Sequence, residues 1–285
     1  MGTPTIQVRP VRDDDIEFLC QFLHQYMDPS LSAQRFLRLF TYAWMAEKPD
    51  RGFVLTDGDR IVGFLGTVYA DREVQARRVR FCNLSSWYVL PEYRNHSLRL
   101  FTAAHSQQNV TFTNLTSRPT VEKVSLALCY EIVNVHKLFT VPFAQAWGLL
   151  RRPRAKVLLD RRRIAEKLAG PLLKIFEDHA PTDCGHLIVE SSGRSCYVIW
   201  NRRVKHSVPF SEILYVSDPG VLKCHFELVK LRILWQDRTL LLAMDQCLLG
   251  KRFWLMYPYR RVTLFRSSEI GKEAIDSLYS ELVLL

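Results

Sequence analysis

Residues 81–104 read FCNLSSWYVLPEYRNHSLRLFTAA, and the rest of the chain can be arranged around this stretch. The apolar, aromatic run 81–90 predicts a buried strand that ends at Pro91. A polar, basic loop follows, and a helix is expected to begin near Ser97. The apolar face of that helix is expected to carry Leu98, Phe101 and Ala104. The stretch therefore predicts a strand, a loop and a helix N-terminus in succession.

The junction between this strand and this helix has the composition of an anion site. Pro91 has no amide hydrogen with which to continue the strand pairing, so we expect the strand to splay there and leave a wedge beside it. The helix N-terminus near Ser97 offers unpaired N–H groups and the positive end of a dipole. Arg94, His96 and Arg99 add positive charge around it. A phosphate group is therefore expected to bind at this junction.

The segment 89–94, VLPEYR, resembles the approach to the pyrophosphate loop of the GCN5-related N-acetyltransferases, the GNAT superfamily. In that superfamily the loop follows the pattern Arg/Gln-x-x-Gly-x-Gly/Ala. Here Ser97 stands at the first glycine position and Arg99 at the second. Serine is small and caps a helix well. The Arg99 side chain would either crowd the pyrophosphate or add a charged contact to it.

The order of elements around the junction extends the resemblance to roughly residues 5–145. The expected elements are a strand at 6–10, a helix opened by a capping box at Asp14 and Glu17, a helix at about 32–47, a hairpin of strands 52–56 and 60–69, a basic loop at 71–80, a parallel strand at 110–115, a helix at 120–130 and a strand at 131–135. Cys129 and Tyr130 stand where the superfamily most often has Gly-Phe. The resemblance implies an α/β fold with a mixed sheet flanked by helices.

The second half of the chain predicts a further α/β domain. Its expected elements are a helix from Asp160 interrupted at Gly170-Pro171, a hairpin of strands 185–190 and 195–200, a strand at 213–216, a helix from Asp218-Pro219, strands at 240–244 and 262–265, and a helix from about Ser268. The order hairpin, strand, helix, strand repeats that of the first half, which suggests a degenerate second GNAT-like unit, with a simple accessory domain as the alternative. The predicted domains are 1–147 and 148–285, joined by an Arg- and Pro-rich linker at 148–156.

The resemblance implies that the first half binds an acyl-CoA, most simply acetyl-CoA, and transfers the acyl group to an amine or hydroxyl of a small-molecule or metabolite acceptor. In the superfamily, amides near the strand end meet the acyl and pantetheine portion, and amides of the loop meet the pyrophosphate. The residues at these places are Trp87, Tyr88, Val89, Leu90, Arg94, Asn95, His96, Ser97, Leu98 and Arg99.

The residues for proton transfer are less well marked. Many members of the superfamily carry a Glu base on the central strand, but residues 81–90 contain no acid. Asn83 and Ser85, which are expected to share one face with Trp87, could position a water molecule there. A general acid is often a Tyr in the late helix, at the place occupied here by Ser125. Tyr130 lies close by in sequence and is the other candidate, although an aromatic side chain there is usually part of the core.

Composition limits the other classes of function. The 285 residues are 48% hydrophobic, enough for two domains or one large one. No apolar run approaches a membrane span and no signal peptide is present, so we expect a cytoplasmic protein without a membrane partner. The seven cysteines include no Cys-x-x-Cys pair and are expected to be reduced, buried thiols, with no metal site. Neither a Gly-x-x-x-x-Gly-Lys loop nor a His-Glu-x-x-His helix occurs.

Three alternatives stay open. The chain could be a non-catalytic descendant of the fold that serves as a binding or regulatory module, since Arg99 and the missing acid depart from the pattern. The formal charge of +10, densest at 151–154 and 161–163, could serve nucleic-acid binding, although a solvated surface with sites for anionic ligands is the expectation. The acyl donor could also be a longer chain or an acyl carrier protein.

Overall fold

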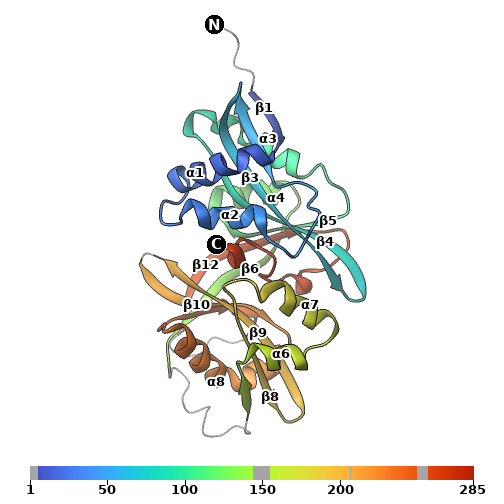
Figure 1. The fold of residues 1–285 in the computed structure, drawn as a ribbon, viewed down its shortest axis with the longest axis vertical. Coiled ribbons are helices and arrows are strands. Elements are labelled where there is room, and N and C mark those ends of the chain that lie inside the picture. Colours follow the sequence, from blue (N-terminus) through green and yellow to red (C-terminus); the bar gives the residue numbers. More distant parts are fainter. Residues whose placement is uncertain (1–5, 144–154, 206, 249–255) are drawn as a thin grey trace. The chain divides into compact units, whose positions relative to one another are not determined.

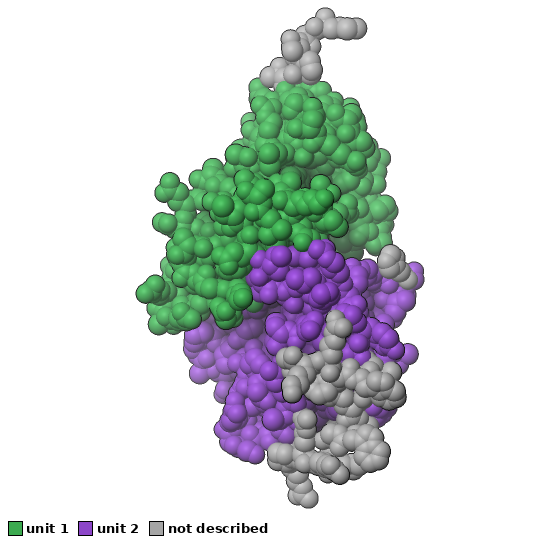
Figure 2. Space-filling model, turned by 180° about the vertical axis from the view of Figure 1, so that it is seen from behind, with its two compact units in different colours: residues 1–131, 264–275, 279–285 green, residues 132–263, 276–278 purple. Residues whose placement is uncertain are grey.

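A computed structural model describes residues 6–143, 155–205, 207–248 and 256–285. The chain divides into two compact units, which Figure 2 colours separately. Unit 1 takes the chain as far as Glu131, together with Leu264–Ile275 and Tyr279–Leu285, and unit 2 takes Ile132–Thr263 and Asp276–Leu278. Unit 1 is therefore assembled from both ends of the described sequence.

Unit 1 is built on a mixed sheet with the strand order β1-β2-β3-β4-β5 (Figure 1). Its strands are β1 (Ile6–Pro10), β2 (Phe53–Asp57), β3 (Arg60–Val74), β4 (Arg77–Val89) and β5 (Val110–Ser117). The first four strands are antiparallel neighbours, whereas β5 runs parallel to β4 because a helix carries the chain back across the sheet. This arrangement confirms the predicted strands and the predicted parallel crossover.

The basic loop expected at residues 71–80 is instead the far end of a long hairpin. Strand β3 continues to Val74 and pairs with Arg77 at the start of β4. Gln75 and Ala76 make the turn, and both have the positive φ that a two-residue hairpin turn requires. Asp71 binds the guanidinium groups on the facing strand, so the charges that suggested a loop are used in cross-strand pairs.

Four helices accompany this sheet, and two of them differ from expectation at their ends. They are α1 (Ile16–Tyr26), α2 (Ala33–Thr41), α3 (Ser97–Ala104) and α4 (Pro119–Ala127). The expected box at Asp14 and Glu17 is wrong, because Asp15 accepts from the Arg12 amide at 2.8 Å. Helix α2 stops at Thr41 and not near residue 47, since the Tyr42 hydroxyl and the Trp44 indole bind the Tyr69 backbone of β3.

The helix expected from about Ser268 does not form. A 3-10 turn, Lys272–Ala274, follows Gly271, and the chain ends in the short helix α9, Glu281–Leu284. The apolar residues here are contiguous and not spaced at helical intervals, and Leu282, Val283 and Leu284 are buried. Burial of this run in unit 1 decides the local structure, because a solvent-facing helix would leave part of it exposed.

Unit 2 contains the remaining strands and, among its described residues, three helices. Its strands are β6 (Glu131–Thr140), β7 (Lys156–Leu158), β8 (Gly185–Ser191), β9 (Arg194–Lys205), β10 (Val208–Val216), β11 (Leu242–Asp245) and β12 (Met256–Arg266, whose last three residues belong to unit 1), and its helices are α6 (Arg161–Lys167), α7 (Gly170–His179) and α8 (Pro219–Asp237). Helix α8 joins β10 to β11, which are parallel. Its apolar face packs on one side of the sheet around Trp200 and Phe226.

The described strands form one 12-stranded mixed sheet flanked by helices, which confirms the expected α/β class. The domain boundary predicted at 147/148, and most of the linker predicted at 148–156, fall outside the described residues and stay predictions. Within the part of the chain that the structure describes, no helix combines the length and apolar character needed to cross a bilayer.

Candidate functional site

Strands β4 and β5 part in the middle of unit 1. Their parallel pairing runs from Arg80 opposite Val110 to Asn83 opposite Thr113 and ends there. Beyond this point β4 continues to Val89 and β5 continues on its own course, so the edges of the two strands that face each other carry unpaired backbone groups. The predicted splay is thus present, but it begins at Asn83 and not beside Pro91.

A bulge in β4 lies directly after the parting. Ser85 pairs with Gly66 and Tyr88 pairs with Phe64, so β4 has one residue more than β3 between these pairs. Ser86 takes up the extra length with a φ of 53°. A bulge reverses the alternation of side chains along a strand. Side chains after the bulge therefore lie on the opposite face of the sheet from the one that unbroken alternation would give them.

Trp87 consequently lies on the opposite face of the sheet from Asn83 and Ser85. Its ring stacks on Phe101 of α3 with 5.2 Å between centroids, while Tyr88 meets Phe22 of α1 at 5.9 Å. The expectation that Asn83, Ser85 and Trp87 share one face is wrong. Strict alternation, on which that expectation rested, ends at the bulge.

The end of β4 is held tightly against β3. The Leu90 amide donates to the Val62 carbonyl at 2.9 Å, so this N–H is already used within the sheet. Gly63 permits the close approach, because a β-carbon there would lie 2.8 Å from a Val89 methyl group. The glycine pair Gly63-x-x-Gly66 is therefore a packing device, and among the strand-end candidates Trp87, Tyr88 and Val89 lie between the bulge and this anchor.

The predicted basic loop is a 3-10 helix, Pro91–His96, that leads directly into α3. The Ser97 amide donates to the Arg94 carbonyl, and no side chain caps the N-terminus of α3. Arg94 and Asn95 are exposed, and His96 and Ser97 are half-buried. The uncapped helix end therefore lies beside positive charge, as the sequence predicted. Some loop amides, however, already donate hydrogen bonds within the 3-10 helix, which would not be the case in an open loop.

Arg99 does not fill the space beside β4. Its guanidinium donates to the Ile6 carbonyl of β1 at 2.9 Å and is exposed. Leu98, expected on the apolar face of α3, is 49% exposed, and the buried face is formed by Leu100, Phe101 and Ala104. Of the two alternatives left open for Arg99, this placement favours a charged side chain at the rim over one that crowds the site.

Asn83 and Ser85 lie where β4 and β5 part, and Asn83 makes more hydrogen bonds within the protein than Ser85 does. The Asn83 amide group donates to the hydroxyl and carbonyl of Thr113 at 3.2 and 3.4 Å, and its oxygen accepts from the Glu281 amide at 3.4 Å. Asn83 thus fastens β4 to β5 where their pairing stops. Ser85 is buried and meets the Ser86 hydroxyl at 3.2 Å.

Tyr130 belongs to a buried aromatic group under α3. His105 Nδ1 lies 2.7 Å from the Phe101 carbonyl, which can only accept, so Nδ1 carries the hydrogen and Nε2 accepts from the Tyr130 hydroxyl at 2.6 Å. Burial raises the pKa of Tyr130 well above its ordinary value and lowers the pKa of His105. These contacts give Tyr130 a place in the core.

Ser125 lies one turn before the end of α4 and is fully buried. Its carbonyl accepts from the Leu128 and Tyr130 amides at 2.9 and 3.1 Å, and Cys129 between them has a φ of 62°. This is the left-handed helix end at which glycine is favoured. The hydroxyl of Ser125 has no hydrogen-bond partner among the described residues, and its role as a proton donor stays a prediction.

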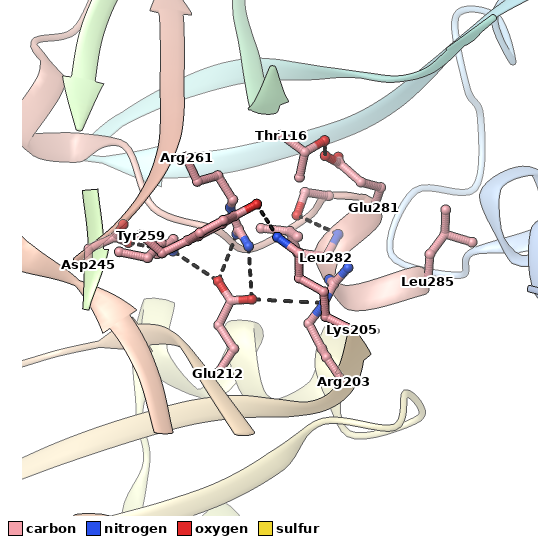
Figure 3. Close-up of polar contacts among 12 residues, drawn as sticks. Thr116, Arg203, Lys205, Glu212, Asp245, Tyr259, Arg261, Glu281, Leu282 and Leu285 are labelled. Carbon is pink, nitrogen blue, oxygen red and sulfur yellow. Dashed lines mark hydrogen bonds and ion pairs between the residues drawn. The ribbon is translucent and has the colours of Figure 1, made fainter. Parts of the chain in front are cut away.

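Glu281 is the acid that sequence reasoning missed. The Thr116 hydroxyl of β5 donates to Glu281 Oε1 at 2.8 Å (Figure 3). The Glu281 amide donates to the Asn83 side chain of β4, so the residue touches both strands where they part. The side chain is 6% exposed. Nearly two hundred residues separate Glu281 from β4, and the one available signal was a single carboxylate within the apolar run LYSELVLL.

Unit 2 offers a contrast at its own crossover helix. The Asp218 carboxylate accepts from the Gly220 and Val221 amides at 2.9 and 3.0 Å and binds Arg194 at 2.6 Å. The pKa of Asp218 is lowered by the Val221 amide and by Arg194. A protein carboxylate therefore occupies the N-terminus of α8, whereas that of α3 has none.

Comparison with known proteins identifies the fold. The sequence matches no family model and no curated protein, but solved structures match over almost all of its length. They include GCN5-related N-acetyltransferases from Anabaena variabilis ATCC 29413 (11% identity, 94% of this chain and 74% of that chain, TM-score 0.57) and Kribbella flavida (12%, 93% and 71%, 0.58). The N-myristoyltransferase of Saccharomyces cerevisiae, solved with myristoyl-CoA, also matches (10%, 93% and 79%, 0.53). The chain has the fold of these acyltransferases.

Proposed function

From the premise that the chain has the GNAT fold, we propose that it is a CoA-dependent acyltransferase. It moves an acyl group, most simply acetyl, from CoA to an amine or hydroxyl of a small acceptor, and it acts in the cytoplasm. The observation that supports this most strongly is the parting of β4 from β5 after Asn83. An open strand edge of this kind inside a sheet needs a partner for its backbone groups.

Pantetheine suits this edge because its two amide groups repeat the donors and acceptors of an extended chain. Bound along the edge of β4, pantetheine would form hydrogen bonds with the backbone groups that β5 no longer pairs with beyond Asn83. The CoA pyrophosphate would then reach the N-terminus of α3, where no carboxylate competes and where Arg94 is exposed. The thioester would lie near the parting point, beside Asn83 and Ser85.

The chemistry follows from this placement. An amine held against the thioester carbonyl reacts as if at high concentration, which can supply on the order of 7 kcal/mol of the barrier. Backbone N–H groups at the bulge are candidates to stabilise the oxyanion. The buried Ser125 hydroxyl is the candidate to protonate the departing thiolate.

The binding step is tested with acetyl-CoA by titration calorimetry. Wild-type protein should give heat, and Arg94→Glu should weaken the affinity about tenfold to a hundredfold, since a charge-assisted contact contributes about 1.5–3 kcal/mol. Arg162→Glu, which reverses an exposed charge on α6 of unit 2, is the control and should leave the affinity for acetyl-CoA unchanged. Transfer is then measured as CoA release with a mixture of primary amines and alcohols.

Two rival functions are separated by the same experiment. No heat at millimolar acetyl-CoA, and none with myristoyl-CoA, would favour a non-catalytic module, for which the internal bonds of the 3-10 helix are the supporting observation. Heat with the longer donor alone would assign a longer acyl chain. Nucleic-acid binding is not favoured, because Arg161 of the basic run donates to the Ala180 and Cys184 carbonyls.

A further inference from the structure

We propose that Glu281 is the general base of the transfer reaction, an inference that rests on the proposed function. A base must lie within hydrogen-bond reach of the proton it removes, and the acceptor must attack where the thioester lies. The Glu281 carboxylate accepts from Thr116 of β5 (Figure 3), and its backbone amide donates to Asn83 of β4. It enters the site from the far end of the sequence, which explains why β4 can do without an acid of its own.

Helix α9 is fixed in place by contacts on both sides of Glu281. Tyr279 meets Trp44 edge-on at 5.5 Å, and the guanidinium of Arg72 lies 5.3 Å from the Tyr279 ring. Arg35 of α2 donates to the Leu285 carbonyl at 3.1 Å. These anchors hold the carboxylate at the parting point, so its geometry does not depend on a mobile loop.

Other well-packed acids of unit 1 lie elsewhere and are committed to other partners. Asp15 is paired with Arg9, and Asp71 with Arg78 and Arg80. Asp50 accepts from Thr67, Tyr69 and Gln107. Among the described acids of unit 1, Glu281 is the one whose recorded contacts join β4 to β5 beyond their last pair. Its position, more than its burial, therefore marks it out.

The step balances as follows. The lone pair of a neutral amine attacks the thioester carbonyl carbon, and Glu281 takes the proton that the nitrogen must lose. The tetrahedral intermediate collapses, the C–S bond breaks, and the CoA thiolate takes a proton from Ser125 or water. Glu281 returns its proton to solvent, and Ser125, where it is the donor, regains a proton from solvent, so that no proton is gained or lost by the protein over a turnover.

The test separates binding from turnover. Glu281→Gln keeps the size of the side chain and an acceptor oxygen for Thr116 but removes the base, so kcat for acetyl transfer should fall about 100-fold to 10,000-fold. The dissociation constant for acetyl-CoA should stay within twofold of wild type. Glu281→Asp should recover part of the rate. Glu273→Gln, at an exposed site on the preceding 3-10 turn, is the control and should keep full activity.

Each result decides the assignment. A Glu281→Gln protein that turns over at the wild-type rate, or that loses acetyl-CoA binding together with activity, overturns the role of Glu281 as base. If wild-type protein binds acetyl-CoA but neither acylates the amine mixture nor hydrolyses the thioester, the base assignment also fails. If wild-type protein does not bind any acyl-CoA, the proposed function fails first, and the calorimetry shows that directly.

Discussion

Buried polar side chains do most to define this fold at the scale of single residues. Asn83 is 2% exposed, and its amide group is shared between Thr113 and the Glu281 backbone. A polar group buried without partners would cost more than these bonds return, so the three contacts specify one register for β4 and β5. Sequence alone suggested that Asn83 could position a water molecule. The structure shows that Asn83 also has a structural role, because it links β4 to β5.

His186 of unit 2 is a buried group of another kind, whose protonation opposes folding. Burial, and after it the positive charges of Arg161 and His179, lower the pKa of His186 to about 3. Its Nδ1 lies 2.7 Å from the Tyr197 hydroxyl. In the unfolded chain a histidine titrates near 6.5, so between pH 6.5 and 3 the unfolded state binds more protons than the folded state.

We therefore expect stability that is fully present above pH 6.5 to be lost as the pH falls toward 3. His186→Gln removes the titrating group and should flatten this dependence by an amount on the order of 4 kcal/mol. The measurement is urea unfolding of wild-type and variant protein at pH 7.5 and at pH 4. Tyr197→Phe keeps the imidazole and should keep the slope, and equal slopes for His186→Gln and wild type would contradict the assignment.

At the scale of elements, the C-terminus of α4 shows how a sequence pattern corresponds to a backbone conformation. Cys129 ends α4 with a φ of 62°, at the place where the resembled superfamily has glycine. The structure explains that preference, because a β-carbon in the left-handed region costs about 1–2 kcal/mol. The cysteine side chain is exposed and so is not required for packing.

Cys129→Gly should accordingly raise the free energy of unfolding by about 1 kcal/mol. Cys129→Ala retains the β-carbon and should give no such gain, which separates relief of backbone strain from loss of the thiol. Urea unfolding midpoints measure both variants. If alanine and glycine stabilise equally, the left-handed conformation is not the source of the effect.

The elements that sequence reasoning predicted are those with a regular pattern. Strand β4, the crossover to β5 and the cap of α8 at Asp218 follow from apolar runs and capping residues. The bulge at Ser86 and the 3-10 helix 91–96 could not be predicted, because neither has a local pattern distinct from a strand or a loop. The long β3–β4 hairpin was missed because its turn, Gln75-Ala76, lacks the usual Gly or Asn.

At the scale of the whole molecule the two units follow one order of elements. In unit 1 an antiparallel pair, a bulge at Ser86, helix α3 and parallel β5 follow one another, and in unit 2 the pair β9–β10, a bulge at Leu214, helix α8 and parallel β11 do the same. The suggestion of a degenerate repeat stays a prediction. Among the described residues, Asp218 caps the N-terminus of α8, whereas no side chain caps that of α3.

The packing of Tyr279–Leu285 in unit 1 can be tested directly by truncation. These residues bury Leu282, Val283 and Leu284 completely or nearly so, and each such side chain contributes about 1.5–3 kcal/mol. A chain ending at residue 278 should therefore lose hydrogen-exchange protection in β4 and β5 by several orders of magnitude. Strands β8 and β9 serve as the internal reference, and unchanged protection in β4 would contradict the placement.

The same packing also has a consequence for synthesis on the ribosome. Translation proceeds at roughly 5–20 residues per second, so the strands of unit 1 leave the exit tunnel many seconds before residue 281 does. A polypeptide released early would carry β4, β5 and α3 but not the carboxylate between them. Prematurely terminated products would thus lack both the carboxylate and the packing that stabilises β4 and β5, so turnover requires synthesis past residue 281.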